Sequence, residues 1–160
     1  MGDWQEAPKG SLPWELNDHI GNLLKRASNL VRREIENTLR PLGMTTQQYL
    51  TMRYSKDVPG ITHSDLEKFL HIEKSSVTSL VTGMEKKGWV TRRHHGEDAR
   101  VKQIYLSESG LQLCNHAYEE VERVKNQVET FLTPQEADIL KILLKKVIHT
   151  YEHHSPRPTT

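Results

Sequence analysis

The stretch SSVTSLVTGMEKKGWVTRRHHGEDARVKQIYL, residues 75–106, decides the fold of this chain. Its first part predicts an amphipathic helix, because its apolar residues recur at the i, i+3, i+4, i+7 spacing of one buried face. Those residues are Val77, Leu80, Val81 and Met84. Its second part predicts two short strands, residues 89–93 and 102–106, on either side of a charged tip. A helix followed by a small β-hairpin is therefore the central unit.

The outer face of this helix carries small hydroxyl side chains. They are Ser75, Ser76, Thr78, Ser79 and Thr82. Ser and Thr are weaker helix formers than Ala, so five on one helix indicate a role beyond folding. Small donors let a helix backbone approach base edges and phosphates in the major groove of DNA. A face that merely contacts solvent is the alternative interpretation.

A second short helix precedes this one and favours the DNA interpretation. Thr62 to Asp65 form a capping-box pattern, and Leu66 and Phe69 give the helix that follows a buried side. The tight connection from residue 71 to residue 74 then makes the pair a helix-turn-helix.

Positive charge is concentrated around the hairpin. Residues 86–102 hold six basic and two acidic side chains, a net charge of +4, whereas the whole 160-residue chain carries only +1. Arginine suits the narrow minor groove of DNA, where the potential is most negative. A basic hairpin beside a helix-turn-helix predicts a winged helix. A hairpin kept polar to protect its strand edges is the alternative.

Long amphipathic helices flank this lobe. The sequence predicts a mainly α fold with a small β-hairpin wing, as one domain over residues 13–150 between a flexible arm (1–12) and a flexible tail (152–160). Within it, 45–106 form the winged helix-turn-helix, and 13–40 and 107–150 form dimerisation helices. Their apolar stripes exceed what the lobe can cover, which favours a two-fold dimer over a monomer with an antiparallel helix pair.

Composition excludes several other classes. The single cysteine, Cys114, permits no intrachain disulfide, and no apolar run approaches the roughly 18 residues of a membrane span. The N-terminus lacks the apolar core of a signal peptide, so we expect a cytoplasmic protein. There is no glycine-rich phosphate loop, nucleophile elbow or paired metal motif, so we expect no enzyme, no cofactor and no metal site.

The ordered series SSVTSLVTGMEKKGWVTRR, EDAR and KQIYLSESG resembles the MarR family of bacterial winged helix-turn-helix transcriptional regulators. The resemblance implies that the hydroxyl face enters the major groove of a pseudo-palindromic double-stranded DNA site. It also implies that Arg100 reaches the minor groove, that Asp98 braces the wing, and that Arg92 contacts phosphate or supports the wing. Two departures are Glu73, in place of a small helix-capping residue, and the tip His94-His95-Gly96. The full set of expected DNA contacts is Ser75, Ser76, Thr78, Ser79, Arg92, Arg93, Arg100 and Lys102.

The resemblance also implies a repressor that a small aromatic or phenolic acid releases from DNA. Residues expected to line that effector pocket are Ile20, Leu24, Tyr49 and Arg53. Two alternatives stay open: a redox- or metal-sensing regulator that uses Cys114 or the histidines, and a winged helix that binds protein instead of DNA.

Overall fold

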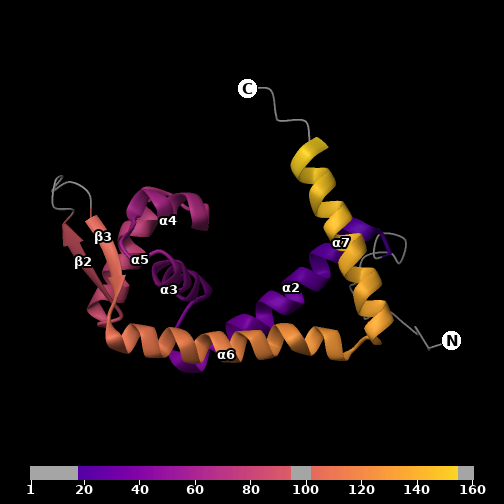
Figure 1. Ribbon diagram of the computed structural model, residues 1–160, viewed down its shortest axis with the longest axis horizontal. Coiled ribbons are helices and arrows are strands. Elements are labelled where there is room, and N and C mark those ends of the chain that lie inside the picture. Colours follow the sequence, from indigo (N-terminus) through magenta and orange to yellow (C-terminus); the bar gives the residue numbers. More distant parts are fainter. Residues whose placement is uncertain (1–17, 95–101, 155–160) are drawn as a thin grey trace, which may run out of the picture. The chain divides into compact units, whose positions relative to one another are not determined.

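The structure, a computed structural model, describes residues 18–94 and 102–154. Its helices are α2 (Ile20–Leu39), η1 (Arg40–Leu42, a 3-10 turn), α3 (Thr46–Asp57), α4 (His63–Leu70), α5 (Lys74–Lys86), α6 (Glu108–Thr130) and α7 (Pro134–His154). Its strands are β1 (Ile61–Thr62), β2 (Val90–His94) and β3 (Lys102–Leu106). The chain forms two compact units, one up to Val121 and one from Glu122. The expectation of a mainly α fold with a small β element is confirmed (Figure 1).

Three helices begin at capping boxes, including the one that the sequence predicts at Thr62. The Thr45 hydroxyl accepts from the amide of Gln48, whose side chain accepts from the Thr45 amide in return. Thr62 with Asp65 and Thr133 with Glu136 repeat the arrangement at α4 and α7. At α5 the N-cap Glu73 makes no such bond, so the recognition helix starts without the usual side-chain cap.

The sheet has three antiparallel strands in the order β1-β3-β2: β2 and β3 form the predicted β-hairpin, and β1 adds a third strand that the sequence does not predict. In β1, Ile61 lies opposite Ile104 of β3, and both side chains are buried. Gly60, at φ +83°, turns the chain into β1, and its amide donates to the Ile104 carbonyl. Two residues are too few to show the alternation of a strand, so the sequence does not predict β1.

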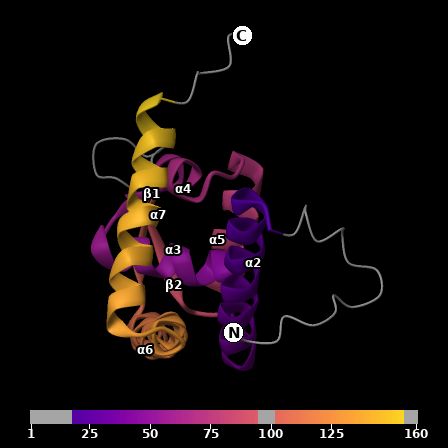
Figure 2. The ribbon, with the colours of Figure 1, turned by 90° about the vertical axis from the view of Figure 1, so that its right-hand side faces the viewer.

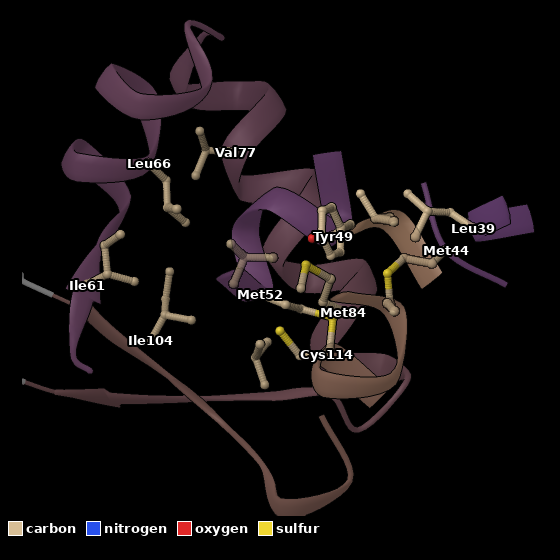
Figure 3. Packing of buried hydrophobic residues seen from close by; sticks show 14 residues of the cluster. Leu39, Met44, Tyr49, Met52, Ile61, Leu66, Val77, Met84, Ile104 and Cys114 are labelled. Carbon is tan, nitrogen blue, oxygen red and sulfur yellow. The ribbon is translucent and has the colours of Figure 1, made fainter. Parts of the chain in front are cut away.

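The core of the first unit is formed by side chains of α3, α4, α5 and the three strands, together with side chains of α6, the long helix that runs past this lobe in Figures 1 and 2. Met52, Leu66 and Met84 are fully buried there together with Cys114 (Figure 3). Cys114, Ala117 and Val121 of α6 belong to this core. The lobe therefore extends past residue 106, and the first half of α6 serves it directly.

The base of the wing joins α6 through close backbone contact at Gly110. The Ser107 amide donates to the carbonyl of Trp89, and the Ser107 and Ser109 hydroxyls donate to the carbonyl of Gly88. A Cβ added to Gly110 would lie 2.0 Å from the Trp89 carbonyl oxygen. The motif SESG therefore fixes where α6 begins against the strand that leaves α5.

The second unit holds the end of α6 and α7, where Lys141 pairs with Glu129 at 2.9 Å. No helix within the described residues is long and apolar enough to cross a bilayer.

Candidate nucleic-acid interface

The buried side of α5 orients its outer face. Val77, Val81 and Met84 have no exposed surface, which anchors one side of the helix in the core. Four hydroxyl side chains then lie in solvent as the sequence predicts: Ser75, Ser76, Thr78 and Ser79. The Thr78 hydroxyl donates to the Lys74 carbonyl at 3.0 Å, so its oxygen still has acceptor capacity for an outside group.

The connection between α4 and α5 is a short turn, as in a helix-turn-helix. His71 caps α4 in the left-handed conformation, at φ 53°, and Lys74 already begins the next helix. The two helices pack directly on each other. The predicted helix-turn-helix is confirmed in the structure.

An ion pair ties the wing to the recognition helix. The Arg92 Nε of β2 donates to Oε2 of Glu85 in α5 at 2.9 Å, and a second guanidinium nitrogen bonds the same oxygen. This hydrogen bonding holds the pKa of Glu85 below its ordinary value. Of the two roles that the sequence left open for Arg92, the geometry favours support of the wing. Glu85 gave no signal in sequence, because the pair forms across the turn at Gly88.

The other basic residues of the wing are exposed. The Arg93 guanidinium carbon lies 4.9 Å from the centre of the Tyr105 ring, and Lys102 pairs in register with His94. Arg100 and Asp98, for which the resemblance implies a minor-groove contact and a bracing role, lie outside the described residues. The proposed DNA contacts at these positions stay predictions.

His63, at the start of α4, is a half-buried titratable residue in the winged lobe. Its Nε2 is buried with no hydrogen-bond partner in the structure. Burial lowers the pKa of His63, and the positive charges of Arg92, Lys102 and Lys74 lower it further, whereas Glu67 opposes them. Cations of β2, β3 and α5 therefore all disfavour the charged form of His63. A histidine inside a capping box carries no distinctive pattern, so the sequence alone does not single out His63.

Acidification is expected to destabilise the lobe through His63. A pKa below the ordinary 6.5 means that the unfolded chain binds this proton more readily. The contribution of His63 to stability is therefore complete above about pH 6.5 and is lost as the pH falls through its folded-state pKa. In urea titrations from pH 8 to pH 5, His63→Gln should lose stability less steeply than the unsubstituted chain. The exposed His116→Gln should follow the unsubstituted chain, and equal slopes for all three would contradict the prediction.

The four residues expected to line an effector pocket do not share one environment. Tyr49 is part of the core, Leu24 is half-buried, and Ile20 is 70% exposed. The Arg53 guanidinium carbon lies 4.1 Å above the Tyr118 ring. Whether an effector binds near them stays a prediction.

The structure gives little support to redox sensing by Cys114 or metal sensing by the histidines. Cys114 is buried, and burial raises the pKa of its thiol, so the reactive thiolate is disfavoured. The rings of His149 and His153 lie 4.1 Å apart on α7. Among the described residues, no group of three or more His, Cys, Asp or Glu side chains is arranged to hold a metal ion.

Comparison with known proteins agrees with this geometry. A model of the MarR family matches residues 42–101, which include α3, α4, α5 and β2. The multiple antibiotic resistance protein MarR of Escherichia coli is 26% identical over 130 residues, which cover 81% of this chain and 90% of that protein. The HTH-type transcriptional regulator YwoH of Bacillus subtilis is 26% identical over 106 residues, or 66% of this chain and 74% of YwoH.

Solved structures extend the likeness to the fold. A crystal structure of a mutant of E. coli MarR superposes with a TM-score of 0.73 at 25% identity, covering 86% of this chain and 98% of that one. The same mutant complexed with operator DNA matches with a TM-score of 0.71 at 25% identity, over 86% of this chain and 99% of that one. The winged-helix fold and the resemblance to the MarR family, whose members are transcription regulators and not enzymes, are thereby confirmed.

Proposed function

Starting from the MarR-family membership of the winged-helix lobe, we propose that this chain is a sequence-specific DNA-binding transcriptional regulator. One observation carries the proposal: α5, with its exposed hydroxyl face, packs against the β2–β3 hairpin, whose Arg93 and Lys102 are exposed. The E. coli relative in complex with operator DNA supports it. Hydroxyl groups serve base edges and phosphates, and the cations serve the phosphate backbone.

The mechanism follows from the shape of the lobe. The helix α5 enters the major groove with its hydroxyl face, while the core side chains beneath it fix its depth and direction. The pair between Arg92 and Glu85 holds the wing at a set angle to that helix, so that the wing follows the neighbouring backbone. The proposal includes a cytoplasmic location, in which the chain would meet DNA.

The regulator is proposed to act as a homodimer. Apolar side chains of α7 lie in solvent in the single chain: Ile139, Leu140, Ile142, Leu143, Ile148 and Tyr151. A self-complementary two-fold interface would cover them. Two recognition helices about 34–36 Å apart then read two half-sites one turn apart, so the operator is a pseudo-palindrome.

Breaking this apolar face is expected to weaken the dimer. Leu143 is 54% exposed in the single chain, and an aspartate there would bury an uncompensated charge in the interface. Leu143→Asp should raise the dimer dissociation constant at least about tenfold in analytical ultracentrifugation. Lys145→Asp, at an exposed position on the same helix, is the control for a new acidic side chain. A Leu143→Asp chain as dimeric as the unsubstituted one would place the interface elsewhere.

Selection of bound duplexes from a random pool tests the proposed function. We expect a two-fold sequence with half-sites one helical turn apart, and affinity that falls on the order of a hundredfold or more between 50 and 200 mM salt. A winged helix that binds protein would show no such dependence. Indifference to every duplex at low salt would overturn the proposal.

Loss of the wing-tip arginine is expected to weaken binding on the selected duplex. Arg100→Ala should cost about 1–3 kcal/mol of binding free energy without unfolding the dimer, because one groove contact is removed. Anisotropy titrations alongside thermal unfolding measure both quantities. An unchanged affinity would remove the wing tip from the interface.

The direction of regulation and its signal are finer proposals that rest on the family resemblance. We infer repression, relieved by a small aromatic or phenolic acid that prefers a dimer with different lobe spacing. A thermal-shift screen with phenolic acids, metal ions and peroxide separates this signal from metal or redox sensing.

A further inference from the structure

Two hollows flank the N-terminus of α3 and share part of their lining. One is a groove of about 490 Å³ that includes Ser75, Ser76 and Ser79 of the recognition helix. The other is a cavity of about 800 Å³ that includes Arg32, Arg40 and Lys87. Thr45, Gln47 and Gln48 line both. The hydroxyl face of α5 is therefore continuous with a second, cationic surface.

The cavity has an excess of positive charge that no acidic side chain in its lining cancels. Its one carboxylate, Glu36, already pairs with Arg32 at 3.0 Å. Arg40 is exposed, and its guanidinium makes no ion pair within the described residues. The Lys87 ammonium donates to the Gly43 carbonyl at 2.7 Å and lies 4.3 Å from the centre of the Trp89 ring. Those contacts position the ammonium and leave it further protons to donate.

One stripe of α5 and its C-cap carries lining residues of both hollows, with a glycine, Gly83, between them. Ser76, Leu80, Gly83 and Lys87 follow one another at intervals of four, three and four residues, so they form one stripe along the helix. A Cβ added to Gly83 would have no heavy atom within 4 Å. Glycine weakens a helix interior relative to alanine, and neither packing nor a positive φ requires it here. A backbone surface without a side chain suits a bulky partner that comes close.

We propose that Arg40, Gln47, Gly83 and Lys87 form a second DNA contact, here named the flanking track, which holds the phosphate backbone beside the half-site. The proposal rests on the proposed function and extends its footprint. Lys87 follows Ser76 by eleven positions, about 16 Å along a helix, so the two side chains can meet different phosphates of one strand. A polyanion that leaves the hydroxyl face along this stripe meets the cations next. Both the continuity of the hollows and the lack of a side chain at Gly83 favour a passing strand.

Binding assays on the full chain test the flanking track with three variants. Two duplexes carry the selected operator, one trimmed to the half-sites and one extended by about six base pairs at each end. The unsubstituted dimer should bind the extended duplex more tightly. Arg40→Gln should lose at least about fivefold on the extended duplex and reduce the magnitude of its salt slope by about two, one phosphate for each protomer. It should lose little on the trimmed duplex.

The second variant separates binding from folding. Gly83→Ala should keep or raise the melting temperature, because alanine favours a helix and meets open space, yet it should weaken binding of the extended duplex several-fold. Lys56→Gln is the matched control, because Lys56 lies at the other end of α3 and its ammonium faces Asn115. It should bind as the unsubstituted chain does.

These experiments distinguish a failure of the flanking track from a failure of the proposed function. The inference is overturned if Arg40→Gln and Gly83→Ala bind both duplexes as the unsubstituted chain does. It is also overturned if Arg40→Gln changes only the response to an added aromatic acid, since the cavity would then hold a small anion. A chain that binds no duplex would overturn the proposed function itself.

Discussion

Replacing Gly110 with alanine is expected to cost about 2–4 kcal/mol of unfolding free energy, because the added Cβ overpacks a rigid junction. The new atom would lie 2.0 Å from the carbonyl oxygen of Trp89 and 2.9 Å from its carbonyl carbon. Both atoms are backbone, so no side chain can rotate away. Relief requires that α6 move off the strand, which would break the bond from the Ser107 amide to the same carbonyl.

Urea unfolding of Gly110→Ala measures this cost, with Gly83→Ala as the matched control. Gly83 lies inside α5 with open space around it, so the same substitution should stabilise the chain by about 0.5–1 kcal/mol. Opposite signs for one chemical change would show that the junction, and not glycine content, sets the effect. A Gly110→Ala chain as stable as the unsubstituted one would mean that α6 begins farther from Trp89.

Helical periodicity made the recognition helix predictable. Val77, Val81 and Met84 fix a buried face by spacing alone, and the hydroxyl face opposite follows without knowledge of the fold. The capping boxes at Thr45, Thr62 and Thr133 are also predictable from the sequence, since each is a local pattern of four residues.

Contacts that depend on the path of the chain could not be predicted from the sequence. Glu85 and Arg92 are seven residues apart on different elements, and only the turn at Gly88 brings them together. The short strand β1 is defined by its pairing with β3, where Ile61 lies opposite Ile104. Its two residues alone carry no alternating pattern that would predict a strand. The apolar stripe of α6 was visible in sequence, but not that Cys114 and Val121 pack into the lobe. The serine and glycine after β3 resembled a family motif, and the structure supplies the reason in the close approach to Trp89.

Ser76→Glu is expected to lower operator affinity on the order of a hundredfold or more, because a carboxylate would face the phosphates and acceptor-rich base edges of the groove. Ser76 is exposed on the hydroxyl face and is the third residue of α5. A glutamate at the third position of a helix favours folding, since it complements the helix dipole and bonds the uncapped N-terminus. Stability should therefore hold or rise while binding collapses, a combination that misfolding cannot produce.

The measurement pairs anisotropy titration of the selected duplex with thermal unfolding. Asn126→Glu, exposed on α6, adds the same charge to the chain and should bind within about twofold of the unsubstituted protein if only the local field matters. Equal losses from both variants would attribute the effect to net charge, against a specific interface on α5. Full binding by Ser76→Glu would turn the hydroxyl face away from DNA. The Arg92–Glu85 brace would then position the wing for some other partner.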